Sequence, residues 1–325
     1  MHTRPLGRTD LTLTELGFGA APIGNLYKPT DDETAEAALH AAWGAGIRYF
    51  DTAPHYGLGL AERRLGRALA QYPRDEYVVS TKVGRLLVPN PAPTGSDLPT
   101  GLFAVPDTLT RRLDYSRDGV RRSLEESLQR LGLDRVDIVL VHDPDDFVDQ
   151  VISEAIPALV ELRDQGVIAA VGVGMNQWQA PLRMVCETDL DAVMLAGRWT
   201  LVDRTGAPLM DECARRGVSV LAAAPYNSGL LAHDWPPDGA NFDYGPAPAD
   251  VLARARSLAE IAQQRGASLP QLAMQFPLQH AATAAVVVGM RTADQVTSSA
   301  ARLAAPLPDD VWDDVESLGR PDAGP

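Results

Sequence analysis

Four polar side chains that could exchange a proton with a bound molecule stand at or just after the ends of short apolar runs. They are Asp51, Tyr56, Lys82 and His142. A free tyrosine has a pKa of about 10, too high for efficient proton exchange near neutrality. A neighbouring ammonium lowers that pKa, a carboxylate keeps the ammonium charged, and an imidazole can orient an oxygen. The set therefore suits proton transfer at an oxygen atom, coupled to movement of a hydride.

Each of these residues also has a structural alternative. His142 or Lys82 alone could be a satisfied structural group, and Tyr56 could be an aromatic packed at a rim. Adjacent strand ends of a barrel converge on one pocket, however, so the shared position favours a common site.

Eight short apolar runs alternate with longer helical patterns. Runs this short and rich in Val and Ile are typical of strands buried on both faces of a parallel sheet. The runs are 16–19, 48–51, 77–82, 136–141, 168–173, 192–195, 218–222 and 285–289. The helical patterns are 34–45, 61–70, 116–131, 157–165, 178–188, 209–216, 251–264 and 292–303.

This alternation predicts an α/β fold in which right-handed βαβ units close into a (β/α)₈ TIM barrel. We expect one domain over residues 1–325. A doubly wound dinucleotide-binding sheet is the alternative, but no Gly-x-Gly-x-x-Gly follows the first run. Two segments rich in Pro and Gly, 83–114 and 226–250, follow strands. We expect them to be long βα loops on the C-terminal face, where barrel active sites lie.

Composition excludes several classes of protein. The chain has 43 acidic and 29 basic residues, for a net charge of −14, which argues against nucleic acid and anionic membranes as partners. No run approaches the ~20 apolar residues of a membrane span, and the start lacks a signal-peptide pattern. Cys186 and Cys213 are too isolated for a metal site or a disulfide framework, so we expect no metal and a cytoplasmic location.

The motifs around the four polar residues resemble those of the aldo-keto reductases. Asp51-Thr52-Ala53 with Tyr56-Gly57, Ser80-Thr81-Lys82 and Leu140-Val141-His142 match the Asp/Tyr/Lys/His tetrad of that family. The likeness runs from Leu6 to Arg291, nearly the whole chain. Its sugar 1-dehydrogenase branch, which includes L-fucose, D-threo-aldose and pyridoxal dehydrogenases, is the most similar. This closer likeness is carried by Asp114-Tyr115-Ser116, His142-Asp143-Pro144-Asp145, Gly172 to Gln177 and Ala196 to Thr200.

The resemblance implies NAD(P) bound on the barrel. Asn176 is then expected at the nicotinamide carboxamide, the segment from Ala224 to Leu230 along the pyrophosphate, and that from Gly289 to Ser299 at the adenosine end. The complete cofactor set is Gly19, Asp51, Asn176, Ala224, Pro225, Leu230, Gly289, Arg291, Gln295 and Ser299. Three positions depart from the family: Ala223 replaces the ring-stacking tyrosine, Ala196 an amide-binding glutamine, and Ser299 a common asparagine.

Selection between NAD and NADP depends on a cation for the 2′-phosphate. Arg291 is the arginine available for this role, although it could equally be a solvated residue at a helix start. Gln295 stands where NADP-selective relatives often have arginine, and Asp294 repels phosphate. We therefore expect both cofactors to be accepted, with a preference below ~100-fold, about 2.7 kcal/mol.

The substrate implied by the resemblance is a small sugar or aldehyde. His55, Arg198 and Trp199, with Asp143 and Asp145, would supply hydroxyl partners and an aromatic face, although Trp199 could equally be core packing. We expect oxidation at C1 of an aldose such as L-fucose to the lactone, with Tyr56 as general acid/base.

Three alternatives remain. The first is a general aldehyde or ketone reductase of the same family. The second is an aldolase with Lys82 as Schiff-base nucleophile, which Asp51 argues against because such a lysine needs to be uncharged. The third is a non-catalytic, cofactor-sensing subunit. The oligomeric state stays open.

Overall fold

The computed structural model describes residues 1–308 and 310–319, so residue 309 and residues 320–325 of the expected domain lie outside the described residues. Eight parallel strands form a closed barrel, which confirms the predicted (β/α)₈ architecture. Its strands are β3 (Leu16–Gly19), β4 (Tyr49–Asp51), β5 (Val78–Val83), β8 (Ile138–His142), β9 (Ala170–Met175), β10 (Ala192–Ala196), β11 (Ser219–Ala223) and β14 (Thr283–Gly289). Pairing of β14 with β3, from Val286 with Leu16 to Gly289 with Gly19, closes the ring.

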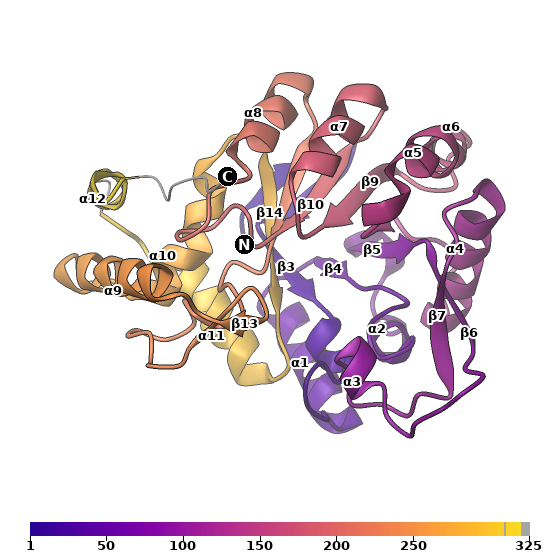
Figure 1. Ribbon diagram of the computed structural model, residues 1–325, viewed down its shortest axis with the longest axis horizontal. Helices are drawn as coiled ribbons and strands as arrows, with labels where there is room; N and C mark the ends of the chain where they lie inside the picture. Colours follow the sequence, from indigo (N-terminus) through magenta and orange to yellow (C-terminus); the bar gives the residue numbers. More distant parts are fainter. Residues whose placement is uncertain (309, 320–325) are drawn as a thin grey trace.

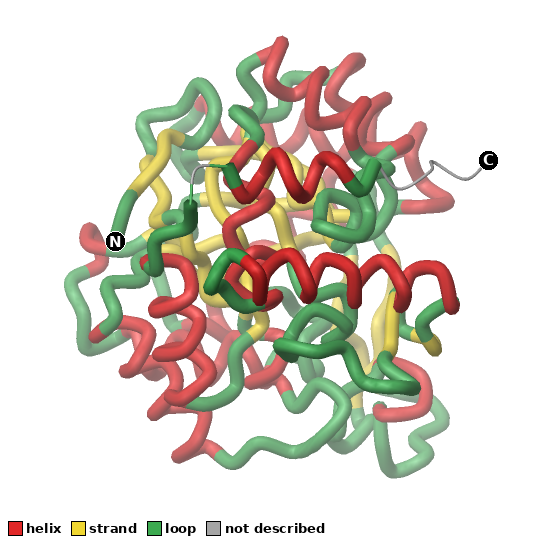
Figure 2. Tube along the Cα trace, turned by 90° about the vertical axis from the view of Figure 1, so that its left-hand side faces the viewer, coloured by secondary structure: helices red, strands yellow, loops and turns green. Residues whose placement is uncertain are grey.

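Helices surround the strands (Figure 1), and in Figure 2 the yellow strands lie inside a red helical layer. Each of the eight helical patterns matches a helix whose bounds lie within two residues of the prediction. They are α1 (Asp32–Gly44), α2 (Leu60–Leu69), α4 (Arg117–Leu131), α6 (Ile156–Asp164), α7 (Gln179–Glu187), α8 (Ala207–Arg216), α9 (Ala249–Gln264) and α11 (Ala293–Ala304). The agreement follows from local signals: the side chains of Asp31 and Ser116 accept hydrogen bonds from the backbone N–H groups of Thr34 and Gly119 at the starts of α1 and α4.

Close packing of the outer layer depends on one glycine of α2. A Cβ atom at Gly66 would lie 1.8 Å from the carbonyl oxygen of Leu131, at the end of α4. Only a residue without a side chain lets these two helices approach so closely.

Several short elements were not predicted. The hairpin of β1 (Thr3–Pro5) and β2 (Thr12–Thr14) precedes the barrel. Leu13 of β2 and Leu6, which follows β1, are buried in the same cluster as Tyr49 and Leu140. The additional helices are α3 (Leu98–Gly101), α5 (Val148–Gln150), α10 (Leu269–Gln275) and α12 (Val311–Ser317). Helices α9, α10 and α12 bury a second apolar cluster with Leu258, Leu272 and Val311, and α9 and α12 lie together on one side of the barrel (Figures 1 and 2).

The two segments predicted as long βα loops contain short strands and a helix that were not predicted. Segment 83–114 contains an antiparallel hairpin of β6 (Arg85–Pro89) and β7 (Leu109–Leu113), with α3 in its connection. Segment 226–250 contains the small hairpin of β12 (Asn241–Phe242) and β13 (Gly245–Pro246). The prolines and glycines that suggested loops lie largely in the connections and bends rather than along the paired strands. These hairpins stand on opposite sides of the barrel centre in Figure 1.

Candidate active site

A buried ion pair forms the floor of the site. The Lys82 ammonium donates to both carboxylate oxygens of Asp51, at 2.8 and 2.7 Å, and to the carbonyl oxygen of Thr52 at 3.1 Å. Lys82 and Asp51 are each only 2% exposed. Burial is the largest single effect and opposes the charge on Lys82, but the Asp51 carboxylate and Tyr56 together outweigh it, so the pKa of Lys82 is raised. A lysine in this state is an ammonium ion, which disfavours the Schiff-base alternative.

A hydrogen-bond chain from inside the barrel orients Asp51. The Ser80 hydroxyl donates to Asp51 at 2.7 Å, and the Tyr49 hydroxyl lies 3.0 Å from the Ser80 oxygen. Strands β4 and β5 bring these groups together, because Asp51 lies opposite Ser80 in their pairing. With Ser80 donating to the carboxylate, the Tyr49 hydroxyl is left to donate to Ser80.

Tyr56 lies over this ion pair. The Lys82 nitrogen is 4.8 Å from the centre of the Tyr56 ring, and a Lys82 hydrogen bond favours the phenolate. Burial nevertheless raises the pKa of Tyr56 to about 12, and Lys82 offsets only part of this rise. The expected contact is therefore present, but the expected net lowering of the tyrosine pKa was wrong, because removal from water opposes the phenolate more strongly than the ammonium favours it.

His142 ends β8 on the other side of Tyr56. Its ring lies edge-on to the Tyr56 ring, with centroids 5.9 Å apart. Burial, with Arg85 and Lys82 nearby, holds the pKa of His142 well below its usual range, so the imidazole is neutral. Its Nδ1 atom is buried without a hydrogen-bond partner among the described residues.

Asp143 adds a carboxylate beside His142. Its Oδ2 atom lies 3.5 Å from Nε2 of His142 and 3.0 Å from the Arg85 guanidinium at the start of β6. Asp143 has a φ of 40°, a left-handed conformation that is uncommon for residues other than glycine. The Tyr115 hydroxyl donates to the carbonyl oxygens of His142 and Asp143, at 2.7 and 3.0 Å, and so fixes this turn.

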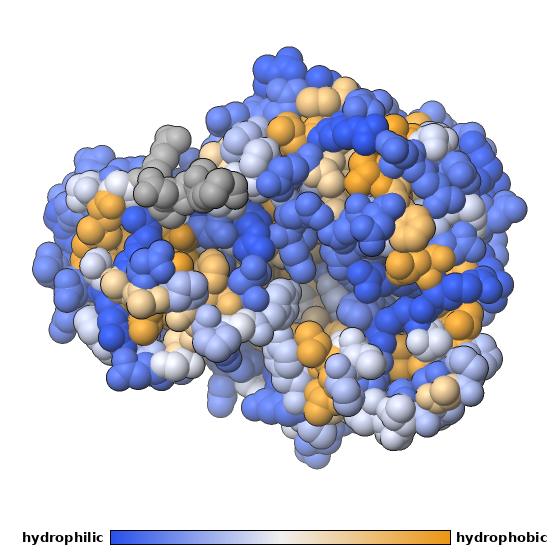
Figure 3. Space-filling view, viewed as in Figure 1, coloured by the Kyte–Doolittle hydropathy of each residue, from blue (hydrophilic) through white to orange (hydrophobic). Residues whose placement is uncertain are grey.

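These groups line a cavity of about 430 Å³ at the C-terminal ends of the strands. Figure 3 shows this face of the molecule as largely hydrophilic and hollowed near its centre. The cavity brings together most of the predicted site residues: Gly19, Asp51, His55, Tyr56, Lys82, His142, Asn176, Ala224 and Gly289.

Three predicted substrate residues do not line the cavity. Arg198 pairs with Asp203 at 3.2 Å and with Asp243 at 2.8 Å, so its guanidinium fixes the β12–β13 hairpin. Trp199 packs on Phe276, with ring centroids 5.4 Å apart, as the packing alternative has it. Asp145 accepts a hydrogen bond from Gln177 and also lies outside the cavity lining.

Some predicted cofactor residues have buried side chains. Leu230 is fully buried in the second apolar cluster, and Ser299 is 3% exposed. Pro225 is also buried. Their side chains are therefore occupied by packing, and it is the neighbouring Ala224 and Gly289 that line the cavity.

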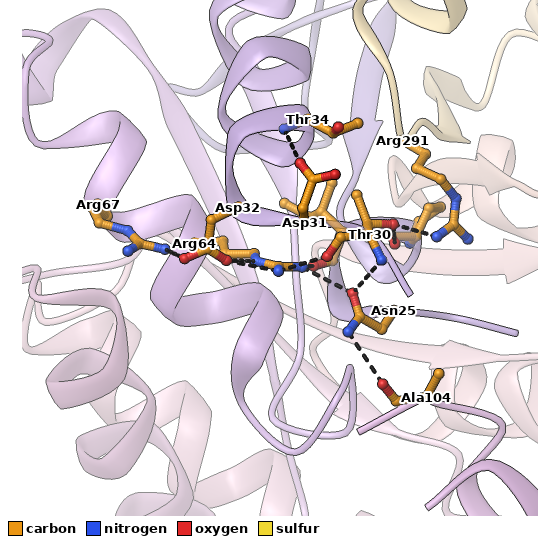
Figure 4. A network of polar contacts seen from close by, with 11 residues as sticks. Asn25, Thr30, Asp31, Asp32, Thr34, Arg64, Arg67, Ala104 and Arg291 are labelled. Carbon is orange, nitrogen blue, oxygen red and sulfur yellow. Dashed lines mark hydrogen bonds and ion pairs between the residues drawn. The ribbon is translucent and has the colours of Figure 1, made fainter. Parts of the chain in front are cut away.

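Arg291 belongs to a network of internal contacts (Figure 4). Its guanidinium donates to the carbonyl oxygens of Leu26 and Lys28, at 2.6 and 2.9 Å, and to the Thr30 hydroxyl. Its backbone N–H donates to the Gln295 side chain at 2.7 Å. The expected phosphate-binding role of Arg291 thus competes with its structural role, because both terminal nitrogens already bind the chain between β3 and α1.

Sequence reasoning missed the apolar rim of the cavity, which includes two aromatic side chains. Phe103 and Leu102 come from the connection within hairpin β6–β7, and Tyr244 comes from the tip of hairpin β12–β13. Tyr244 also hydrogen-bonds the Asn176 side chain. The signal available was the position of these aromatics inside segments that follow barrel strands, but nothing in the sequence indicated which of them turn inward.

The residues around Asn176 fit a flat nicotinamide ring. Gly19, Ala196, Ala223, Ala224 and Gly289 have no side chain or only a methyl group, and they leave this part of the cavity wall open. Asn176 is exposed and offers one amide donor and one acceptor, which a carboxamide needs.

No group of three or more potential metal ligands occurs within the described ranges 1–308 and 310–319. Over the same part of the chain, none of the helices has the length and apolar character needed to cross a membrane.

A parallel barrel with a Lys–Asp pair beneath a tyrosine defines an oxidoreductase of the aldo/keto reductase type. The model of the aldo/keto reductase family matches residues 15–320, and the chain belongs to this family. It is 45% identical over 306 residues to D-threo-aldose 1-dehydrogenase of Pseudomonas sp., covering 93% of each chain. It is 38% identical to pyridoxal 4-dehydrogenase of Microbacterium luteolum, covering 97% of each.

A solved structure supports the same assignment. The holo form of an aldo-keto reductase from Bacillus halodurans matches with a TM-score of 0.79 at 25% identity, over 100% of this chain and 98% of that one. The chain is therefore an enzyme of this oxidoreductase family, and NAD(P) is its cofactor.

Proposed function

We propose that this enzyme oxidises the C1 hemiacetal of a small aldose, L-fucose or a sugar like it, to the lactone. The observation that carries the proposal is the buried Asp51–Lys82 pair under Tyr56, within a cavity that also holds two neutral imidazoles and Asp143. The 45% identity to D-threo-aldose 1-dehydrogenase supports the choice of substrate.

Tyr56 is the proposed proton acceptor. As phenolate it takes the proton of the C1 hydroxyl while the C1–H bond breaks and the new carbonyl of the lactone forms. Lys82 stabilises the phenolate, and Asp51 keeps Lys82 charged and in place. His142, neutral and beside Tyr56, orients the reacting oxygen.

NAD(P), when bound, accepts the hydride at its nicotinamide ring. Asn176 would hold the carboxamide, and Gly19, Ala224 and Gly289 would flank the cofactor. His55 and Asp143 would bind the other sugar hydroxyls. We expect a small-molecule substrate with no nucleic-acid or membrane partner, and a cytoplasmic location in keeping with the free thiols of Cys186 and Cys213.

Reduction of aldehydes or ketones is the second candidate, and two observations favour it. With a pKa raised to about 12, Tyr56 is a phenol at neutral pH and can donate a proton to a carbonyl oxygen. Leu26, Leu102, Phe103 and Met175 also make part of the cavity wall apolar.

A substrate panel separates the two candidates. Aldoses and aldehydes are tested with NAD⁺ and NADP⁺, and carbonyl compounds with the reduced cofactors, by absorbance of the reduced nicotinamide. We expect an aldose to have the highest kcat/KM, with the lactone as product, and deoxy analogues to be rejected strongly, by up to about 10⁴-fold. The aldose assignment is wrong if apolar aldehydes or ketones are turned over with higher kcat/KM than every aldose.

A further inference from the structure

His55 lines the cavity beside Tyr56 and His142. Its ring lies edge-on to the His142 ring, with centroids 5.6 Å apart, and edge-on to Phe103 at 5.2 Å. A neutral imidazole carries one proton, on either Nδ1 or Nε2, and so offers one donor and one acceptor. Which nitrogen faces a ligand as a donor therefore depends on the partner of the other nitrogen.

That partner is Arg111 of strand β7. Its Nε–H group donates to Nδ1 of His55 at 2.6 Å, and its Nη2 donates to the His55 carbonyl oxygen at 3.0 Å. A guanidinium is always protonated in proteins and has no acceptor, so Nδ1 of His55 must be the unprotonated nitrogen. The proton of the ring then lies on Nε2.

Asp97 holds Arg111 in this position. The Asp97 carboxylate is 2% exposed and receives both terminal nitrogens of Arg111, Nη2 at 2.7 Å. The chain is built around this pair, because a Cβ atom at Gly101 would lie 2.2 Å from the Asp97 carboxylate and 2.4 Å from Arg111. Two of the guanidinium's three nitrogens are fixed by Asp97, and the third points at His55.

We propose that Arg111, fixed by Asp97, is a positioning residue that keeps His55 in the Nε2–H tautomer, so that His55 donates a hydrogen bond to a hydroxyl or carbonyl oxygen of the substrate. This inference rests on the proposed function, because it takes the ligand of the cavity to be a substrate with several hydroxyl groups. In this arrangement His55 contacts the substrate, and Arg111 acts through His55.

The electrostatics of the cavity agree with this geometry. Burial, then Arg111, Arg85 and Lys82, lower the pKa of His55 to about 2, so the ring stays neutral over the working range of an enzyme. Both guanidiniums come from hairpin β6–β7, at its start and near its end.

The direct test is ¹⁵N NMR of the histidine rings in the enzyme without substrate. Long-range ¹H–¹⁵N spectra report the tautomer, and His55→Phe identifies the His55 signals by their loss. We expect the Nε2–H form alone, unchanged between pH 5 and pH 9. In Arg111→Met we expect a mixture of tautomers or a titration within this range. A wild-type His55 with its proton on Nδ1, or one that titrates in this range, overturns the proposal.

A double-mutant cycle tests the consequence for binding. Loss of one buried donor raises KM for the best substrate about tenfold or more in both His55→Phe and Arg111→Met. If Arg111 acts through His55, adding Arg111→Met to His55→Phe has little further effect, and Arg111→Met has less effect in a His55→Gln background, because the glutamine amide donates without a tautomer. An equal rise in KM in all backgrounds contradicts the proposal.

Arg112→Met is the matched control. It changes the next residue of β7, whose side chain is 54% exposed and contacts Asp114 only at 4.0 Å, so neither the His55 spectrum nor KM should change. If Arg111→Met does not fold, Asp97→Asn loosens the same guanidinium and should give the same spectral change in weaker form. The NMR result is independent of turnover, so it stands even if the aldose assignment fails.

Discussion

Strand β5 supports two buried carboxylates, one on each face, and their surroundings differ. Lys82 points to the barrel interior and pairs with Asp51 at the edge of the cavity, whereas Thr81 points outward and donates to Glu62 at 3.0 Å. Glu62 is fully buried and also pairs with Arg130 of α4. Consecutive residues of a strand face opposite sides, so one short segment serves both pairs.

The two buried pairs differ in what their charged groups contact. Burial raises the pKa of Glu62, but hydrogen bonds from Arg130, Ser127 and Thr81 oppose this rise and surround its carboxylate. The Asp51–Lys82 pair instead leaves its ammonium in contact with Tyr56, beside open space for a ligand. Burial of an ion pair is therefore no sign of function by itself, whereas a buried pair that contacts a titratable group in a cavity is.

The largest expected effect is that of Tyr56→Phe. Because it removes the proposed proton carrier, kcat should fall by about 10²–10⁴-fold while the dissociation constant of the cofactor stays nearly unchanged. Steady-state kinetics and fluorescence titration measure the two quantities. Tyr72→Phe is the control, since the Tyr72 hydroxyl hydrogen-bonds His40 on the outer side of the barrel, at 2.8 Å, and does not line the cavity. Retention of more than about a tenth of wild-type kcat in Tyr56→Phe would show that another group carries the proton.

The double variant Asp51→Asn/Lys82→Met tests the ion pair without leaving one charge buried alone. Lys82 lowers the pKa of Tyr56 and Asp51 raises it, with Lys82 the larger effect, so removing both should raise that pKa further. Oxidation needs the phenolate, so its rate rises with pH through this pKa, and the rise should move to higher pH in the variant. Profiles of kcat/KM from pH 7 to pH 10 lie below both pKa values, so the shift appears as a lower rate in the variant at every pH, with the same rise of about tenfold per pH unit. Equal rates in the two enzymes would show that the ion pair does not set the pKa of Tyr56.

Glu62→Gln should affect stability and spare catalysis. It weakens a buried, charge-assisted contact with Arg130, which we expect to lower the free energy of unfolding by about 1–3 kcal/mol. Urea denaturation measures this loss, and kcat should stay within about twofold of wild type because Glu62 does not line the cavity. A large loss of kcat in the folded variant would show that Glu62, on the outer face of β5, also contributes to catalysis.

Arg291→Met gives the smallest expected effect and extends the comparison to the network of Figure 4. Arg291 and Arg64 both bind carbonyl oxygens of the chain between β3 and α1, Arg64 at 2.6 Å to Ile23 and 2.8 Å to Thr30. Loss of Arg291 should therefore weaken NAD⁺ and NADP⁺ alike, within about threefold of each other, as isothermal titration would show. Selective loss of NADP⁺ affinity by more than about tenfold (~1.4 kcal/mol) would show that Arg291 binds the 2′-phosphate of NADP⁺.

The sequence predicted the barrel and the tetrad because both depend on local patterns. Apolar runs of four to six residues mark buried parallel strands, and Asp51, Lys82 and His142 stand at or just after their ends. The paired strands of β6–β7 were hidden by the prolines and glycines around them. The substrate side of the cavity depends on how these hairpins fold back, which is a matter of tertiary contacts.

Side chains with several possible partners were the hardest to predict. Arg198 and Arg291 each stand two residues after a residue that lines the cavity. Their guanidinium groups nevertheless bind Asp243 and the carbonyl oxygen of Leu26 instead of facing the cavity. The direction of the pKa shift of Tyr56 could not be predicted from the sequence either, because it depends on the extent of burial as well as on the neighbouring Lys82. Partners distant in the chain decide all three.

We expect ionisation of Tyr56 to control hydride transfer from the substrate. A single-turnover experiment tests it: excess enzyme and NAD⁺ are mixed with an aldose carrying hydrogen or deuterium at C1, and reduced cofactor is followed between pH 7 and pH 9. With a phenol whose pKa is raised to about 12, we expect an isotope-sensitive rate that increases about tenfold per pH unit. An isotope-sensitive rate that does not change over this range would contradict Tyr56 as the proton acceptor.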